Sequence, residues 1–337
     1  MKAMTLKEPG KIIKNDLPKP SPGPTEVAVE IKNVGVCGSD MEYYETGRIG
    51  EFVVEEPIIL GHEAAGQIVE VGKDVENLQV GDRVALEPGI PCRKCEYCKH
   101  GRYNLCPDVE FMATPPYDGA FVEYLTHPED FAFKLPKSVS YEEGALIEPF
   151  SVGIYATERA KLEVNDKLII LGAGPIGLST LIAASAKGIT DITVTDVIDF
   201  RLNQAKELGA EEVVNVSEES IKNFFSDFDK VIQTAGTGET YQQAIKLSRR
   251  GGTVVQVGTP AVDKVEIDPN LPITREIDLV GAFRYANTYP KAISLLKNED
   301  INLKAMVSKY FSLEEVEQAL QCPKDNPDKC IKAMIDV

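Results

Sequence analysis

The sequence has 337 residues, of which 43% are hydrophobic and 26% charged, as is typical of a globular protein with two domains. The formal net charge of −17 argues against nucleic acid and anionic membranes as partners, because both would repel it. The sequence contains neither an apolar run long enough to span a bilayer nor the apolar region of a signal peptide after Met1, so we expect a cytoplasmic protein.

The first half of the chain is predicted to form a β domain. Short segments of β-rich or alternating composition are separated by proline and glycine, a pattern typical of a barrel-like β domain. The expected strands are Glu26–Val34, Ala65–Val71, Arg83–Leu86, Phe121–Leu125 and Phe131–Leu135. This pattern changes near Leu162.

Beyond that point the pattern predicts alternating strands and helices. Six apolar strands joined by crossovers indicate a doubly wound parallel sheet in an α/β domain. The strands are expected at Lys167–Leu171, Asp191–Asp196, Glu212–Val216, Lys230–Ala235, Thr253–Gly258 and Ile277–Phe283. The intervening helices are expected at Pro175–Lys187, Phe200–Leu208 and Glu239–Leu247, with a further helix between the third and fourth strands. A helix over Pro290–Lys297 and short mixed elements follow, and this tail is expected to pack back on the β domain.

A glycine-rich turn predicts a dinucleotide site. The run Gly172-Ala173-Gly174-Pro175-Ile176-Gly177 directly follows a predicted strand and opens a helix. In such a turn the first glycine permits the tight bend, the second lets a pyrophosphate approach the backbone, and the third lets the helix pack closely on the sheet. The helix N-terminus then faces the negative charge of the phosphates.

Asp196 indicates which dinucleotide is bound. It ends the next predicted strand, where a carboxylate accepts hydrogen bonds from the adenosine ribose and repels a 2′-phosphate. Arg201 lies nearby and could instead pair with a 2′-phosphate, or it could be a solvated helix residue near the adenine. With Asp196 present, we expect NAD rather than NADP.

Four of the seven cysteines have the spacing of a structural zinc site. Four thiolates close a tetrahedral shell and leave no open position for a substrate. These cysteines are Cys92, Cys95, Cys98 and Cys106. Cys322 and Cys330 have no such pattern, and we interpret them as buried or incidental thiols.

A second, more dispersed set has the character of a catalytic metal site. Cys37 lies in Val36-Cys37-Gly38-Ser39-Asp40, and His62 and Glu63 follow about twenty-five residues later. Three mixed ligands and a water are typical of catalytic zinc, and Asp40 could accept a hydrogen bond from the second ring nitrogen of His62. Each residue also has an ordinary structural explanation, so composition alone leaves this assignment open.

The sequence resembles the zinc-containing medium-chain dehydrogenases over its whole length, and their sorbitol (polyol) dehydrogenase branch most of all. The family segments are Gly35–Asp40, Leu60–Ala64, the four-cysteine segment and Gly172–Gly177. The segments that favour the polyol branch are Gly47–Val54, Met112–Pro116, Ile147–Pro149 and Phe283–Thr288.

This resemblance implies a GroES-like β-barrel catalytic domain at residues 1–149, completed by residues 289–337, with a doubly wound Rossmann domain inserted at 150–288. It also implies two zinc ions per chain and NAD as cofactors, and a homo-oligomer, either a tetramer or a dimer. Cys37, His62 and Glu63 would hold the catalytic zinc, and Glu148 would either bind it directly or hydrogen-bond its water.

The reaction that the resemblance implies is oxidation of a polyol to a ketose, and the reverse reduction. Ser39 would receive the hydroxyl proton, and Tyr43, Arg284 and Tyr285 would hydrogen-bond the other hydroxyls. We also expect contacts to the cofactor from Val257, Gly258 and Phe283.

Two departures from the family pattern leave alternatives open. Glu42 stands where many alcohol dehydrogenases end the proton relay on a histidine, and the four-cysteine segment is also kept by threonine and butanediol dehydrogenases. The alternatives are therefore a zinc dehydrogenase of L-threonine or a butanediol, or a non-catalytic NAD-binding protein of the same fold. The second should have lost a ligand of the catalytic zinc, and this chain has lost none.

Overall fold

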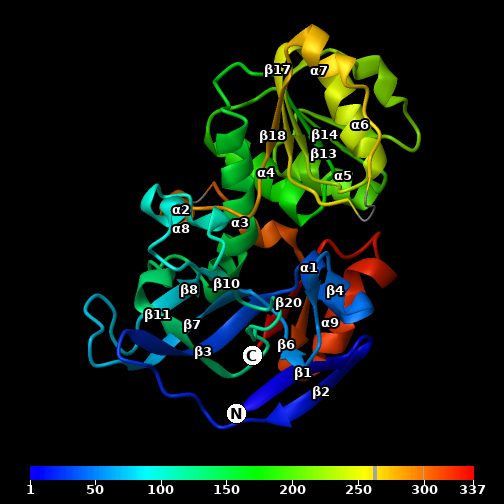
Figure 1. Cartoon of the computed structure of the whole chain (residues 1–337). Helices are drawn as coiled ribbons and strands as arrows, with labels where there is room; N and C mark the ends of the chain where they lie inside the picture. The colour runs from blue at the N-terminus through cyan, green and yellow to red at the C-terminus, as the bar shows by residue number, and fades with distance from the viewer. Residues whose placement is uncertain (261–263, 299) are drawn as a thin grey trace. The chain divides into compact units, whose positions relative to one another are not determined.

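The computed structural model describes residues 1–260, 264–298 and 300–337, which form two compact units (Figure 1). The first unit contains residues 1–148, 289–298 and 307–337, and the second contains residues 149–260, 264–288 and 300–306. Within the described ranges, no helix has both the length and the apolar character that a membrane span requires.

The segment 300–306 differs from our prediction that the whole tail packs on the first unit. It belongs to the second unit because its 3₁₀ turn η4 (Leu303–Met306) packs against helix α4 (Pro175–Ala186). There the Ser179 hydroxyl donates to Met306 Sδ at 3.5 Å.

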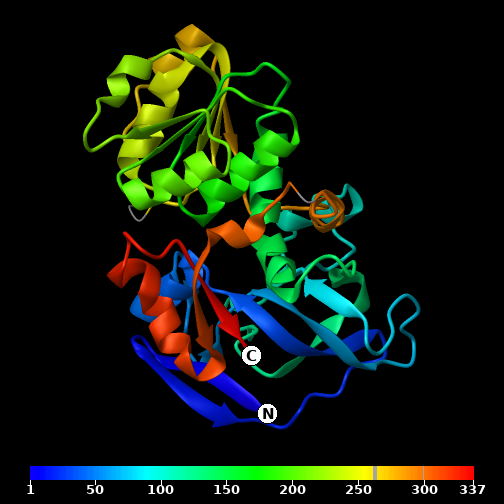
Figure 2. The ribbon, with the colours of Figure 1, turned by 180° about the vertical axis from the view of Figure 1, so that it is seen from behind.

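The first unit contains a seven-stranded, mostly antiparallel sheet. Its order is β12-β8-β7-β3-β20-β19, with β11 also on β3. The strands are β3 (Glu26–Gly35), β7 (Glu63–Val71), β8 (Arg83–Leu86), β11 (Tyr124–Pro128), β12 (Ala132–Lys134), β19 (Val307–Ser312) and β20 (Lys332–Asp336). Figure 2 shows the red strand β20 beside the blue strand β3, so segments far apart in the sequence share this sheet.

Smaller elements complete the first unit. A three-stranded sheet has the order β2 (Lys11–Asp16), β1 (Lys2–Glu8), β6 (Ile58–Ile59). Two short pairs are β4 (Arg48–Ile49) with β5 (Phe52–Val53), and β9 (Gly89–Ile90) with β10 (Glu110–Phe111). The helices are α1 (Gly38–Thr46), α2 (Glu96–Lys99), α8 (Tyr289–Leu295) and α9 (Val316–Asp325), with 3₁₀ turns η1 (Tyr103–Leu105), η2 (Glu129–Phe131) and η5 (Leu313–Glu315).

The strand predicted at Phe121–Leu125 is displaced toward the C-terminus. Residues 119–121 bond to the loop 59–61 instead, with Gly119 N donating to Ile59 O and Phe121 N to Leu60 O. A regular ladder therefore begins only at Tyr124, where β11 pairs with β3. Phe121 itself is fully buried in the core of this unit.

The second unit confirms the predicted doubly wound sheet. Its six strands pair in parallel in the order β15-β14-β13-β16-β17-β18, with helices on both faces (Figures 1 and 2). They are β13 (Leu168–Leu171), β14 (Ile192–Asp196), β15 (Glu212–Asn215), β16 (Phe228–Gln233), β17 (Ser248–Gln256) and β18 (Asp278–Gly281). The remaining helices are α5 (Asp199–Glu207), α6 (Gly238–Leu247) and α7 (Asn270–Arg275).

Several helices differ from the prediction, since α1, α7 and α9 were not predicted. The helix expected between the third and fourth strands is only the 3₁₀ turn η3 (Ile221–Phe224), whose Ile221 joins the core beneath α6. Conversely, the long helix α3 (Tyr141–Arg159) was not predicted, and it contains Pro149.

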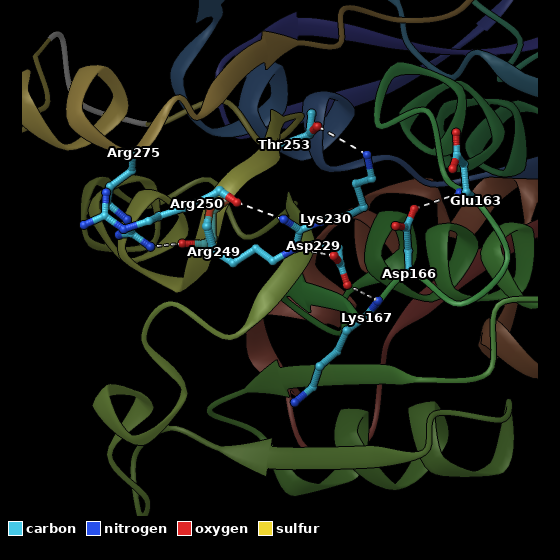
Figure 3. Close-up of polar contacts among 10 residues, drawn as sticks. Glu163, Asp166, Lys167, Asp229, Lys230, Arg249, Arg250, Thr253 and Arg275 are labelled. Carbon is cyan, nitrogen blue, oxygen red and sulfur yellow. Dashed lines mark hydrogen bonds and ion pairs between the residues drawn. The ribbon is translucent and has the colours of Figure 1, made fainter.

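Charged side chains lie at the amino ends of the parallel strands (Figure 3). Asp229 accepts from Lys167 N at 2.8 Å and pairs with Arg249, while Lys230 Nζ donates to the hydroxyl of Thr253 at 3.4 Å. At this edge of the sheet the Asp229 carboxylate is therefore already paired within the protein. The carboxyl ends of the same strands are where ligands bind in this class of sheet.

Candidate functional site

Strand pairing brings the three residues of the predicted catalytic metal set together. In the β3–β7 ladder Gly35 lies opposite Glu63, so Cys37, two residues beyond Gly35, comes close to His62 and Glu63. One ligand atom from each of Cys37, His62 and Glu63 lies within 4.8 Å of the others. A thiol, an imidazole and a carboxylate in such a group are the mixed donor set that a catalytic zinc takes.

The start of helix α1 fixes the position of Cys37. Cys37 is the N-cap residue, and its backbone N–H donates to Asp40 Oδ2 at 3.0 Å. Asp40 Oδ1 accepts from Gly61 N at 2.9 Å, which ties the loop before His62 to this helix. Gly61 has φ +88°, a conformation that favours glycine, and a Cβ there would also collide with the ring of Phe121.

The contact predicted between Asp40 and His62 is present. His62 Nδ1 lies 3.4 Å from Asp40 Oδ1, and both side chains are buried. Burial alone would raise the pKa of Asp40, but the charge of His62 and the hydrogen bonds from it, from Cys37 N and from Gly61 N outweigh burial and lower that pKa. An ionised Asp40 orients the imidazole and leaves its other nitrogen for a metal.

Lys332 is a site residue that the sequence reasoning missed. Its ammonium group binds Glu63 Oε1, and the two side chains are 2% and 1% exposed. Burial opposes the charge on Lys332, but the negative charges of Glu63 and Cys37 outweigh it and raise its pKa. Lys332 belongs to β20, which pairs with β3 at Gly35, so sheet topology alone brings it to the site.

The surroundings of the second carboxylate oxygen of Glu63 show whether this group of side chains fits a metal cation. Glu63 Oε2 is buried and has no hydrogen-bond partner within the described structure. A Cβ on Gly35 would lie only 2.0 Å from this oxygen, so a larger residue there would displace the Glu63 carboxylate. An orphaned carboxylate oxygen beside a thiol and an imidazole fits a bound divalent zinc.

The other residues expected near this metal are positioned as follows. Glu148 is buried on α3 and does not join the three-residue group, although its charge contributes to the raised pKa of Lys332. Ser39 is half-buried in the first turn of α1, two residues from Cys37. Tyr43, on the same helix, is 3% exposed and belongs to the core of this unit.

Glu87 is another buried residue that the sequence reasoning missed. It follows β8 and accepts a hydrogen bond from the hydroxyl of Tyr103 at 2.7 Å, while its Oε2 is buried without a partner in the described structure. Burial raises the pKa of Glu87 to about 7, partly offset by the Tyr103 bond and reinforced by the charge of Glu148. His127 Nε2 lies 3.0 Å from the backbone oxygen of Glu87, and burial lowers the pKa of His127 to about 4.

The four-cysteine segment converges as its spacing predicts. Ligand atoms of Cys92, Cys95, Cys98 and Cys106 all lie within 4.8 Å of one another. Cys95 Sγ caps helix α2 by accepting from Cys98 N, and Cys106 Sγ accepts from Cys92 N at 3.4 Å. Backbone hydrogen bonds from residues 94 and 95 lower the pKa of Cys92 to about 7, which favours a thiolate. The group fits a closed structural zinc.

Four of the predicted cofactor residues line a cavity of about 710 Å³ in the second unit. Gly172, Gly174, Asp196 and Arg201 are among its lining residues, with Lys222 and Lys246 contributing positive charge. Asp196 Oδ2 accepts from Ala173 N at 2.8 Å, and its Oδ1 accepts from Val197 N at 2.8 Å. The glycine turn and the carboxylate are therefore held together as one structure.

The glycines of this turn fit a dinucleotide in the way the sequence predicts. Gly172 has φ +105°, and a Cβ on Gly177 would lie 1.8 Å from Gly172 O. A Cβ on Gly174 would instead meet nothing within 4 Å, which leaves open space beside the N-terminus of α4, where Pro175 and Ile176 begin the helix. That space suits the approach of a phosphate group to the backbone.

The remaining predicted contacts lie after the later strands of the same unit. Val257 and Gly258 follow β17 and both donate their backbone N–H to Gln233 O. Phe283 is 54% exposed, and the guanidinium of Arg284 lies over its ring at 4.9 Å. Tyr285 is 3% exposed.

Two family models match the chain. Residues 23–137 match the alcohol dehydrogenase GroES-like domain, and residues 175–298 match the zinc-binding dehydrogenase domain. Together these ranges cover more than half of the sequence, so the chain belongs to the zinc-binding dehydrogenases, and the resemblance and the fold class inferred from sequence are confirmed. It is a zinc- and NAD-dependent oxidoreductase.

Within this family, the chain is 46% identical to a sorbitol dehydrogenase of Bacillus subtilis, over 99% of this chain and 97% of the relative. An Escherichia coli oxidoreductase/dehydrogenase of unknown specificity has a solved structure with a TM-score of 0.95 and 39% identity, over 99% of this chain and 98% of that one. The structure of 2R,3R-butanediol dehydrogenase from Bacillus subtilis gives a TM-score of 0.90 at 31% identity, over 100% and 99% of the two chains.

Proposed function

We propose that the protein oxidises a polyol of the sorbitol or xylitol type to the ketose with NAD, and catalyses the reverse reduction. The observation that carries this proposal is the group of Cys37, His62 and Glu63. In it a half-buried thiol and a buried imidazole lie beside a buried carboxylate oxygen that has no hydrogen-bond partner in the described structure. A carboxylate-containing metal site is harder and more hydrogen-bonding than a thiolate-rich one, which suits a substrate with many hydroxyls. The 46% identity to a sorbitol dehydrogenase supports the same substrate class.

When bound, zinc supplies a Lewis acid that lowers the pKa of the substrate hydroxyl, and NAD supplies the hydride acceptor. Cys37, His62 and Glu63 would hold the metal, Asp40 would orient His62, and Lys332 would orient Glu63. Ser39, in the first turn of α1, would accept the proton of the substrate hydroxyl. The helix N-terminus after Gly174 would bind the pyrophosphate, and Asp196 would accept from the adenosine ribose.

The substrate contacts rest on the family resemblance. Tyr43, Arg284 and Tyr285 would hydrogen-bond the hydroxyls that are not oxidised, and Glu148 would bind the metal or a water beside it. A site with buried polar groups discriminates against simple alcohols, because such substrates leave those groups unpaired. The contacts of Val257, Gly258 and Phe283 with the cofactor belong to the same proposal.

Oxidation of a butanediol or of L-threonine is the second candidate. The TM-score of 0.90 to a butanediol dehydrogenase and the retained four-cysteine group both favour it. The lower identity to that enzyme, 31% against 46%, and the sequence Phe283-Arg284-Tyr285 favour the polyol.

Steady-state kinetics test this choice. Stereodefined polyols, L-threonine and 2,3-butanediol would be compared as substrates with NAD and with NADP, on enzyme whose zinc content has been measured. We expect the highest kcat/KM for a polyol with NAD and two zinc ions per chain. A much higher kcat/KM for threonine or butanediol would refute the polyol assignment, and one zinc per chain after full loading would favour a protein without catalysis.

Location and assembly form part of the proposal. Clustered thiols that bind metal are typical of a reducing compartment, which supports the cytoplasm. The family resemblance supports a homo-oligomer, a tetramer or a dimer, and light scattering on the purified protein measures its mass directly.

A further inference from the structure

Cys322 and Cys330 form a buried pair that belongs to neither metal group. Cys322 lies on α9, and Cys330 lies two residues before β20. Their sulfur atoms are 2.8 Å apart, about 0.8 Å beyond the roughly 2.0 Å of a covalent S–S bond. Within the described structure, neither cysteine joins a group of three or more metal-ligating side chains. Their spacing in the sequence does not predict that they pair.

The backbone between the two cysteines holds them in this position. Asn326 N donates to Cys322 O at 3.0 Å, and Cys330 N donates to Asn326 O at 2.9 Å. These two bonds fold the chain back on itself at the end of α9. Cys322 is also on the buried face of that helix, with Val316, Ala319 and Leu320. The two sulfurs therefore face each other because of the fold, without a change in the course of the backbone.

We propose that Cys322 and Cys330 are a site of reversible disulfide formation, with a hydroperoxide as the oxidant. The Cys322 thiol loses its proton and the sulfur attacks one peroxide oxygen. The O–O bond breaks, a sulfenic acid forms, and for hydrogen peroxide the departing hydroxide takes up that proton to give water. The thiolate of Cys330 then attacks that sulfur, the S–O bond breaks, and the departing hydroxide takes up a proton to give a second water. Two thiols are oxidised and one hydrogen peroxide is reduced.

Burial determines which oxidant and which sulfur react first. Cys322 is 4% exposed and Cys330 is fully buried, so a small peroxide reaches Cys322 more readily than a bulky disulfide would. A sulfenic acid at Cys322 would have the second sulfur beside it, and intramolecular closure would compete with further oxidation. A dithiol such as dithiothreitol would restore the reduced pair after local opening.

The position of the pair makes its oxidation state relevant to the candidate zinc site. Only Ile331 lies between Cys330 and Lys332, whose ammonium binds Glu63. A disulfide would link α9 covalently to the start of β20 and would restrict opening of this segment. Forming this disulfide would remove no zinc ligand, because neither sulfur belongs to a candidate metal group of the described structure.

The test uses the full-length, zinc-loaded protein treated with increasing hydrogen peroxide. At each dose, remaining thiols are alkylated under denaturing conditions with a chelator, and the digest is searched by mass spectrometry for a cross-linked peptide lighter by two hydrogen atoms. Zinc released into solution is measured in parallel and shows when the cysteines of either candidate zinc site begin to oxidise. Cys322→Ser and Cys330→Ser are matched controls, because each removes one sulfur and keeps a residue of similar size.

We expect the Cys322–Cys330 peptide to accumulate before zinc is released, to disappear with dithiothreitol, and to be missing in both serine variants. The oxidised protein should also have a higher midpoint of unfolding than the reduced protein. The proposal is refuted if zinc is released while Cys322 and Cys330 are still fully alkylated, or if Cys322 proceeds to a sulfinic acid without cross-linking. Since the wild-type peptide decides the matter, a serine variant that fails to fold would not rescue the proposal.

Discussion

Glu87→Gln should make the free energy of unfolding of the protein less dependent on pH. Glu87 is 1% exposed, and its pKa is raised from the ordinary 4.5 to about 7. Between these pH values the folded protein holds a proton that the unfolded chain releases, so stability from this group is present below pH 4.5 and is lost as pH rises to 7. With about 1.4 kcal/mol per pKa unit, the ionisation of Glu87 costs about 2.5 kcal/mol more at pH 8 than at pH 5.

Glutamine has the shape of a protonated glutamate and stays neutral at both pH values, so it should avoid that cost. Urea unfolding of wild type and variant at pH 5 and pH 8 measures the difference, and other titrating groups cancel in the comparison. We expect the variant to gain about 2.5 kcal/mol relative to wild type between the two conditions. Glu70→Gln, at an exposed position on β7, is the control and should show the same effect at both pH values. An equal effect of Glu87→Gln at pH 5 and pH 8 would refute the reasoning.

Four further changes test the metal, cofactor and proton roles. Lys332→Met leaves the Glu63 carboxylate buried without its partner, so the zinc-free protein should lose about 3–5 kcal/mol and zinc should restore more stability than in wild type, as measured by urea unfolding with and without chelator. Cys106→Ser should lower the zinc content from two ions to one and lower the unfolding midpoint, while Ser→Cys reversion restores both. Asp196→Ala should weaken NAD binding and relax the exclusion of NADP, and an unchanged NAD preference by titration calorimetry would contradict the role of that carboxylate. Ser39→Ala should lower kcat about 10²–10⁴-fold at neutral pH with little change in zinc content, and a wild-type kcat would remove Ser39 from the proton path.

The parts of the fold that were predictable are those with a strong local signal. The strands of the second unit contain short apolar runs, as in Leu168–Leu171, since both faces of a parallel sheet are covered. In the first unit, Arg83–Leu86 was predicted with the same bounds. Helix α3 was missed because Pro149 and the glycines at 144 and 153 are unfavourable inside helices. Pro149 is tolerated there, and Gly153 packs so closely that a Cβ would lie 2.5 Å from the backbone of Ser179.

Some residues of the candidate site could likewise be predicted from the sequence, and others could not. Asp40 could be assigned to His62 because it lies in the same short segment as Cys37 and its role follows from metal chemistry. Lys332 could not be found, because it is 269 residues from Glu63 and only the pairing of β20 with β3 brings it there. Glu87 and the Cys322–Cys330 pair have no spacing that distinguishes them from ordinary residues. Long-range strand pairing determines the position of Lys332, whereas local backbone hydrogen bonds at the end of α9 determine that of the cysteine pair.

The pairing of β20 with β3 also bears on how the protein is made. During synthesis the N-terminal part of the chain emerges first, so Cys37, His62 and Glu63 leave the ribosome long before Lys332. Until β20 adds to the sheet, the Glu63 carboxylate lacks the ammonium group that accompanies it in the folded protein, and the edge of β3 is unpaired. The nascent β domain therefore carries all three candidate zinc ligands before the positive charge that accompanies Glu63 in the folded protein is in place.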